Sequence, residues 1–144
     1  MKTDRFVGTW RLTLLEFRGT NGKTARPFGA HPSGVLTYDR AGNVTAQIMG
    51  SDRKPFASDD TSKATAQEAI SAVQTFISYF GRYDVDEKGG KVTHHVLGSV
   101  FPNWTGGDQV RFFSFSKDGL ALSTPPLPFG GEMMTAVLEW EKIG

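Results

Sequence analysis

The amino-acid sequence predicts an all-β protein: an antiparallel up-and-down barrel of about eight strands, with one helix between strands 3 and 4. Three observations support this fold. Short segments with alternating apolar and polar residues recur along the 144 residues, glycine-containing turns separate them, and a single stretch changes to helical spacing. Aromatic residues make up 12% of the chain and there are 17 glycines, a composition typical of strands and tight turns around an apolar interior.

The first predicted strand covers residues 6–17. Neighbouring side chains on a strand point to opposite faces, so the alternation places Trp10, Leu12 and Leu14 together on one face. A polar loop with two prolines, residues 19–34, follows this strand and is long for a hairpin connection.

The other predicted strands share the same alternation, and most are separated by short turns that contain glycine. They cover residues 34–39, 43–49, 81–87, 91–100, 108–116, 120–126 and 132–143. Short connections between consecutive strands favour an antiparallel meander. Eight strands are enough to close a barrel, and closure removes the exposed sheet edges and leaves room for one small ligand.

The period changes to that of a helix over residues 65–80. Thr65 and Glu68 match a capping box, in which each side chain binds a free backbone amide of the first turn. Apolar residues then recur every three or four positions and form a stripe on one face: Ala69, Ile70, Val73, Phe76, Ile77 and Phe80. We therefore expect one helix that ends near Gly81.

Bulk properties predict a single domain over residues 1–144 and narrow the classes of partner. Sixteen basic and fifteen acidic residues give a net charge of +1, which does not favour nucleic acid or an anionic membrane surface. There are no cysteines, and the three histidines show no metal-ligand spacing, so we expect no metal and no cofactor. The N-terminal residues lack the apolar stretch of a signal peptide, which predicts a cytoplasmic protein.

Several short motifs resemble one family. Gly8-Thr9-Trp10 at the start of the first strand, followed by a long loop, looks like the lipocalin group, and further motifs resemble the small bacterial and fungal lipocalin-like domain proteins. These motifs are RPFG (26–29), PSGVLTYD (32–39), AQIM (46–49), DRKPF (52–56), FGRYDV (80–85), VTHHV (92–96), FPNW (101–104), DQVR (108–111) and LSTPP (122–126).

The resemblance implies a lipocalin-like or calycin-like barrel that binds a hydrophobic molecule. Some members of the family belong to natural-product pathways, and related barrels catalyse cyclisation or isomerisation. The chain departs from true lipocalins, because their later Thr-Asp-Tyr motif is missing and its helix precedes the fourth strand instead of following the last one. The resemblance therefore implies the barrel more strongly than secretion or transport, and it carries over no catalytic set.

Two adjacent histidines lie in the strand at 91–100, and only one of them can face the barrel interior. His94 shares its face with Val92 and Val96, whereas His95 lies on a more polar face. We therefore predict that His94 points inward and His95 outward. An inward His94 is either a polar anchor or acid/base group in an apolar pocket, or a core histidine with ordinary hydrogen-bond partners.

The remaining ligand candidates are aromatic or amide side chains that strand phase, or a position at the barrel mouth, places near an interior pocket. Together with His94 they are Trp10, Tyr38, Gln47, Tyr83, Asn103, Trp104, Phe112 and Trp140. Each of them is also compatible with simple core packing. Gln109 and Arg111 are further candidates, and Arg111 is expected outside, paired with Asp84 or Asp108.

These features support three functional hypotheses. The first is a protein that binds a small hydrophobic molecule in the barrel. The second is a cofactor-independent isomerase, cyclase or dehydratase for a polyketide- or terpenoid-like substrate, with His94 as the catalytic acid or base. The third is an interaction module with a solid core. The sequence leaves open the ligand, the question of catalysis and the oligomeric state, for which a homodimer is one option.

Overall fold

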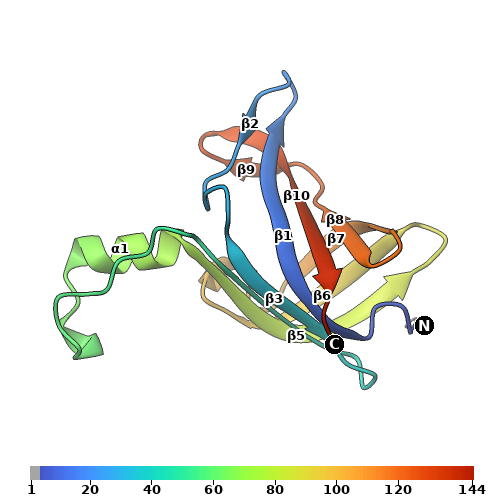
Figure 1. Ribbon diagram of the computed structural model, residues 1–144, viewed down its shortest axis with the longest axis horizontal. Helices are drawn as coiled ribbons and strands as arrows, with labels where there is room; N and C mark the ends of the chain where they lie inside the picture. The colour runs from blue at the N-terminus through green and yellow to red at the C-terminus, as the bar shows by residue number, and fades with distance from the viewer. Residues whose placement is uncertain (1–3) are drawn as a thin grey trace.

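The computed structural model describes residues 4–144, which form a closed antiparallel barrel (Figure 1). The barrel strands are β1 (Gly8–Gly19), β3 (Ser33–Tyr38), β4 (Asn43–Met49), β5 (Phe76–Asp86), β6 (Lys91–Ser99), β7 (Asp108–Phe115), β8 (Gly119–Ser123) and β10 (Glu132–Lys142). Each strand pairs with the next one in this order, and β10 pairs back with β1. The prediction of an eight-stranded antiparallel barrel is confirmed. Two short strands lie outside this closed set. Strand β2 (Thr24–Ala25) pairs with β1, and β9 (Leu127–Phe129) pairs with β10.

The first strand changes phase at an irregularity that strict alternation does not predict. The pairing of β1 with β10 shifts between Leu12 and Leu14, as in a β-bulge. Trp10 and Leu12 are buried as expected, but the extra residue turns Leu14 away from the interior and brings Leu15 into it. The predicted placement of Leu14 with Trp10 and Leu12 is therefore wrong.

The helix lies where the sequence predicts it but is shorter. It is α1 (Ala66–Gln74), and Thr65 and Glu68 form both hydrogen bonds of the capping box. The predicted extension to residue 80 is wrong, because β5 begins at Phe76 and pairs with β4. Residues 76–80 fit both a helical and an alternating pattern, and the backbone hydrogen bonds available from β4 decide in favour of the strand.

The part of the predicted apolar stripe that lies in α1, namely Ala69, Ile70 and Val73, stays exposed. Helix α1 contains no buried residue, and Ile70 and Val73 are 49% and 52% exposed. Figure 1 shows the helix, together with the short 3₁₀ helix η1 (Thr61–Lys63), standing away from the barrel beside the start of β5. The outward Phe80 of β5 instead covers Gly98 of the neighbouring strand.

Aromatic side chains fill one end of the barrel. Phe6, which precedes β1, is fully buried and meets Tyr38, Phe113 and Phe115 edge-on, with ring centroids 5.0 to 5.3 Å apart. The indole Nε1 of Trp10 donates to the Phe6 carbonyl at 3.0 Å. Such a cluster leaves little space between the strands, so this end of the barrel is a packed core.

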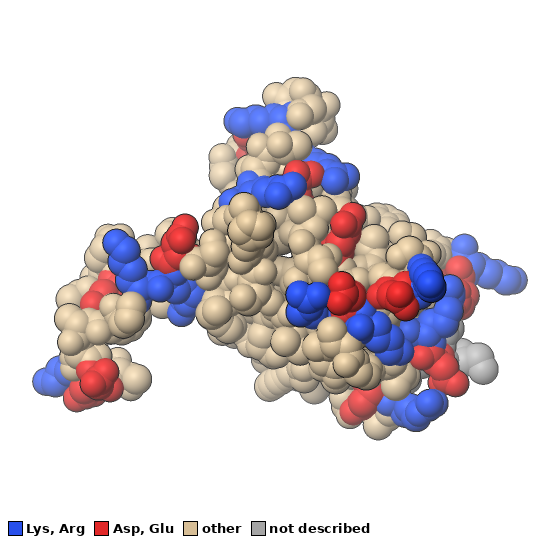
Figure 2. All heavy atoms as spheres, in the orientation of Figure 1, with Lys and Arg blue, Asp and Glu red and all other residues tan. Residues whose placement is uncertain are grey.

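Charged side chains of both signs are interleaved on the face shown in Figure 2. Exposed ion pairs on the protein surface include Arg11 with Glu141 at 2.8 Å and Arg5 with Glu87 at 3.2 Å. None of the helices within residues 4–144 combines the length and apolar character needed to cross a membrane.

Candidate functional site

A cavity of about 380 Å³ lies in the half of the barrel away from Phe6. Strand β1 contributes Leu15 and Phe17 to its wall but not Trp10, and β5 contributes Ile77 and Tyr79 but not Tyr83. Most of the wall is apolar. The polar side chains that line it are Gln74, Ser78, Tyr79, His94, Ser99, Trp104, Gln109, Arg111, Thr124 and Trp140. A mainly apolar pocket with a few polar groups is the usual form of a small-molecule site.

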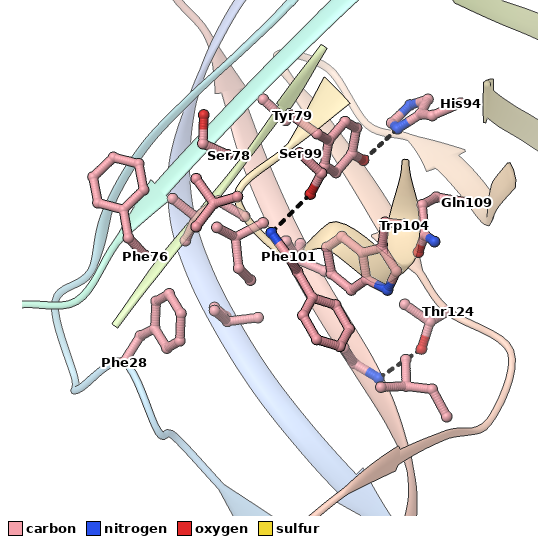
Figure 3. Close-up of a pocket in the computed structure, with 18 of the residues that line it drawn as sticks. Phe28, Phe76, Ser78, Tyr79, His94, Ser99, Phe101, Trp104, Gln109 and Thr124 are labelled. Carbon is pink, nitrogen blue, oxygen red and sulfur yellow. Dashed lines mark hydrogen bonds between the residues drawn. The ribbon is translucent and has the colours of Figure 1, made fainter. Parts of the chain in front are cut away.

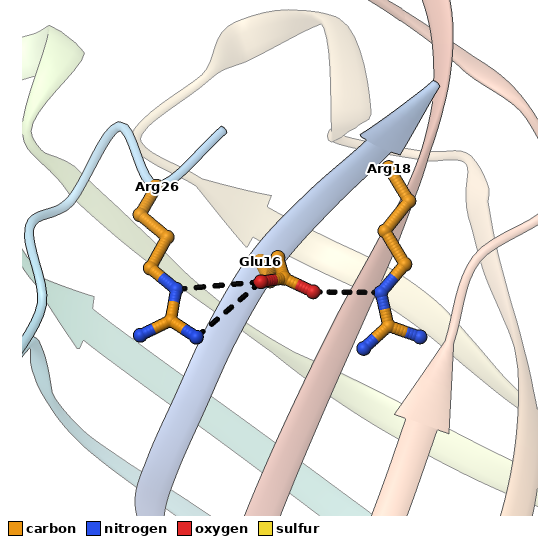
Figure 4. Close-up of polar contacts among 3 residues, drawn as sticks. All are labelled: Glu16, Arg18 and Arg26. Atoms are coloured by element: carbon orange, nitrogen blue, oxygen red, sulfur yellow. Dashed lines mark hydrogen bonds and ion pairs between the residues drawn. The ribbon is translucent and has the colours of Figure 1, made fainter. Parts of the chain in front are cut away.

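Loop residues complete the cavity wall. Phe28, from the long loop after β1, is buried and lines the cavity, and Ser51 holds its carbonyl with a backbone hydrogen bond of 3.2 Å. Arg26 in the same loop binds Glu16 of β1, which also binds Arg18 at 2.7 Å (Figure 4). These contacts fasten the loop to the barrel beside the cavity and so position the Phe28 ring.

His94 lies at the centre of a buried hydrogen-bonded chain. Its ring is 1% exposed, and it meets the Tyr38 hydroxyl through Nε2 at 2.7 Å and the Tyr79 hydroxyl through Nδ1 at 2.5 Å. The Tyr79 contact is visible in Figure 3. Tyr79 and His94 line the cavity, whereas Tyr38 lies behind His94 in the core. Three strands, β3, β5 and β6, each supply one member of the chain.

Burial keeps this imidazole neutral. Loss of solvation, followed by the positive charges of Arg111 and His95, lowers the pKa of His94 to about 3. A neutral imidazole has one N–H donor and one acceptor nitrogen, so one tyrosine hydroxyl donates to His94 and the other accepts from it. The tyrosine that accepts keeps its own O–H for another acceptor. If this tyrosine is Tyr79, its hydroxyl can donate to a molecule in the cavity.

Arg111 lies on the cavity wall and not on the outside as the sequence suggested. Burial on β7 shows that Gln109, Arg111, Phe113 and Phe115 share the inward phase. The Arg111 guanidinium donates to its neighbour's carbonyl, Val110 O, at 3.0 Å and to Gln109 Oε1 at 3.3 Å. No carboxylate of residues 4–144 forms an ion pair with it, and the described residues that line the cavity include no aspartate or glutamate.

One buried donor on the wall has no acceptor among the described residues. Trp140 is 3% exposed and lines the cavity, and its indole Nε1 has no hydrogen-bond partner among the described residues. An unpaired buried donor costs roughly 1–3 kcal/mol. Together with the N–H groups of Arg111 that bind neither Val110 nor Gln109, it offers hydrogen-bond donors to a molecule in the cavity.

His95 points outward, as predicted, and closes an ion-paired cluster on the barrel surface. Its Nε2 lies 2.8 Å from Asp84 and its Nδ1 lies 2.8 Å from Asp108. The hydrogen bonds to Asp108 and then Asp84 raise the pKa of His95. The sequence suggested Asp84 and Asp108 as partners of Arg111, but both carboxylates bind His95 instead.

The structure brings three of the predicted ligand residues to the cavity: His94, Trp104 and Trp140. Three others, Trp10, Tyr38 and Tyr83, are buried but do not line it. Tyr83 instead donates its hydroxyl to the Asp39 carbonyl at 2.9 Å. Trp104 lies in the short helix η2 (Pro102–Trp104), with its ring edge-on to that of Tyr79 at 6.0 Å.

Three predicted ligand residues lie away from the cavity. Gln47 is on the outer face of β4, whose inward residues are Val44, Ala46 and Ile48. Phe112 is 42% exposed because Phe113 takes the inward phase of β7. Asn103 is exposed in η2, where the turn points Trp104 alone toward the barrel.

Tyr79 and Thr124 line the cavity although neither is among the residues predicted from the sequence. Tyr79 falls in the stretch taken for helix, so no strand phase was assigned to it. The alternation Ile77, Tyr79, Gly81, Tyr83 was the signal that could have found it. Thr124 follows β8 and is buried, with its hydroxyl accepting from Ala136 N at 2.9 Å. Within residues 4–144, no group of three or more histidine or acidic side chains is arranged to hold a metal ion.

Comparison with known proteins agrees with this architecture. The chain is 29% identical over 107 residues to the 4'-hydroxy-3'-methoxypropiophenone carrier protein ppsC of Aspergillus oryzae, a match that covers 69% of the chain and 96% of the relative. A sequence profile described as a lipocalin-like domain matches residues 7–143, nearly the whole chain. The protein therefore belongs to the lipocalin-like domain family.

Proposed function

We propose that the protein binds a small aromatic molecule in its barrel cavity and carries it. The observation that carries the proposal is the cavity itself: about 380 Å³ of apolar space in one half of a closed barrel whose other end is packed. This volume is within the range of about 300–1,000 Å³ that is typical of small-molecule pockets. It also counts against the hypothesis of a solid interaction module.

The character of the wall favours an aromatic ligand with polar substituents. The rings of Phe28, Phe101 and Trp104 offer faces and edges for stacking. Arg111 and Trp140 offer donors to a carbonyl or hydroxyl oxygen. The relative from Aspergillus oryzae is named for carrying an aryl ketone with hydroxyl and methoxy groups. A compound of this kind suits the wall described here, and we use it as the probe.

A matched pair of variants tests whether the cavity is the binding site. Ala46 faces the cavity, and the neighbouring Thr45 faces outward on the same strand. Titration of 4'-hydroxy-3'-methoxypropiophenone, followed by tryptophan fluorescence and native mass spectrometry, should show one bound molecule. Ala46→Phe should weaken binding at least about tenfold by filling the space, while Thr45→Phe should leave it unchanged. Equal affinity for both variants would place the site elsewhere. A wild-type protein that binds neither the probe nor an apolar dye would refute the proposal.

A second candidate function, cofactor-free isomerisation, cyclisation or dehydration, is favoured by the chain Tyr38–His94–Tyr79. Both ring nitrogens of His94 are already bonded, so His94 would act through the Tyr79 hydroxyl that reaches the cavity wall. Deuterium exchange at the carbon next to the probe's carbonyl separates the two functions. Exchange that the wild type accelerates and Tyr79→Phe does not would indicate acid/base catalysis. A bound probe without accelerated exchange would indicate a carrier.

A further inference from the structure

We propose that the cavity binds its ligand as an anion, with an acidic hydroxyl of a conjugated aromatic ring deprotonated and paired with the Arg111 guanidinium. The inference rests on the proposed function and specifies the chemical class of the ligand. The uncharged form of the same ring would then bind less tightly.

The position of Arg111 carries the inference. It is the one charged side chain among the described residues that line the cavity, and it comes from the inward phase of β7. Its hydrogen bonds go to neutral oxygens, on Val110 and Gln109. Arg111 is partly buried. A guanidinium that loses part of its hydration gains most from an anionic partner, because a neutral acceptor does not balance its charge.

No titratable group on the facing strands supplies that negative charge. Burial raises the pKa of Tyr79 on β5 and of Tyr38 on β3, so both hydroxyls stay protonated at neutral pH. His94 on β6 is neutral because its pKa is about 3. The nearby carboxylates of Asp84 and Asp108 lie on the outer face, where they hold His95. Among residues 4–144, therefore, no negative charge on the cavity wall balances that of Arg111.

An acidic phenol is the ligand that fits this charge and the apolar wall together. A hydroxyl conjugated with a ring carbonyl is more acidic than an ordinary phenol, because its negative charge spreads onto the carbonyl oxygen. The guanidinium lowers the pKa of such a hydroxyl further. The delocalised anion is still a flat ring that can stack on Trp104. The unpaired indole donor of Trp140 offers a hydrogen bond to another oxygen of the same ligand.

The test measures the ionisation of the bound probe directly. The phenolate form of 4'-hydroxy-3'-methoxypropiophenone absorbs at longer wavelength than the phenol, so a pH titration of its absorbance gives its pKa free and bound to saturating wild-type protein. We expect a bound value lower by about one unit or more, because an opposite charge within contact distance shifts a pKa by about 1–3 units. Bound and free values that agree, or a higher bound value, would overturn the inference without any variant.

Two variants and a second ligand identify the source of the shift. Arg111→Met should remove the pKa shift of the bound probe and weaken binding of the phenolic probe at least about tenfold. Arg111→Lys should keep part of the pKa shift and part of the affinity. Arg40→Met, which removes an exposed arginine paired with Asp4, serves as the charge control and should change neither. The dimethoxy analogue, which has no ionisable hydroxyl, should lose much less affinity than the phenolic probe when Arg111 is replaced by Met.

The outcomes separate this inference from the proposed function. If the dimethoxy analogue binds the cavity but the phenolic probe binds no more tightly and with an unshifted pKa, the carrier function stands and the anionic ligand is wrong. If neither compound binds, both proposals fail.

Discussion

The Tyr79 hydroxyl and the Nδ1 atom of His94 are 2.5 Å apart, and this contact joins the cavity wall to the packed core. Beyond His94 the chain continues to Tyr38, whose ring lies edge-on to Tyr83 with centroids 4.7 Å apart. A ligand that touches Tyr79 is therefore connected through hydrogen bonds to Tyr38, which does not line the cavity.

Removal of either tyrosine hydroxyl should destabilise the fold, but only one of them should change binding. Tyr38→Phe and Tyr79→Phe each leave one nitrogen of His94 without a partner, at a cost of about 1–3 kcal/mol in urea unfolding. Tyr79→Phe should also weaken the aryl ketone probe, by about fivefold for one lost hydrogen bond. Fluorescence titration provides the comparison. A Tyr38→Phe variant that binds as weakly as Tyr79→Phe would show that Tyr79 has no separate role at the cavity.

The buried imidazole of His94 should make the protein sensitive to acid. Its folded pKa, about 3, lies below the value of about 6.5 for an unfolded chain, so the neutral form is favoured in the fold. This contribution is fully present above pH 6.5 and is lost as the pH falls toward 3, since the unfolded chain takes up a proton that the folded state excludes. The loss is on the order of a few kcal/mol. Urea midpoints across this range measure it, and NMR should show a His94 ring that does not titrate near pH 6.5.

His95 should give the folding stability the opposite pH dependence, with a loss at alkaline pH. Asp108 and Asp84 raise its pKa above the unfolded value of about 6.5, so its contribution is fully present below that value and is lost as the pH rises through the folded pKa. His95→Gln should flatten the stability profile on this alkaline side only. Because the cluster is exposed, the effect should stay below about 1 kcal/mol and shrink with added salt. A wild type and variant with parallel profiles above pH 6.5 would contradict the ion pairs.

Gly81 should tolerate no side chain. It lies at a register shift between β5 and β6, and a Cβ atom there would collide with the backbone carbonyl of His95. Gly81→Ala should cost about 3 kcal/mol, because a backbone atom cannot move aside as a side chain can. Gly107→Ala is the matched control, since the nearest atom to its Cβ would be Trp104 O at 3.6 Å. Thermal unfolding distinguishes them, and equal melting temperatures would show that the strands can shift at Gly81.

Much of the fold follows from local pattern, and the exceptions share a cause. The capping box at Thr65 and Glu68 is a local signal and holds in the structure. The end of that helix is not local, because residues 76–80 satisfy two periods and the strand that pairs with them is far away in sequence. The prediction for Leu14 is wrong for a related reason. A bulge shifts the phase of every residue after it, and the alternation of apolar and polar residues does not reveal where the bulge lies.

The sequence by itself determined most of each barrel strand, the turns, the start of the helix and the inward direction of His94. These depend on alternation and on short-range hydrogen bonding, which neighbouring residues specify. Only the tertiary structure decided that the interior holds a cavity and that Tyr79 and Tyr38 bind the two nitrogens of His94. It also decided that Arg111 faces this cavity with no acidic partner among residues 4–144. The physical reason is that space and charge balance inside a barrel depend on how strands distant in sequence come into register, and a single strand does not specify that register.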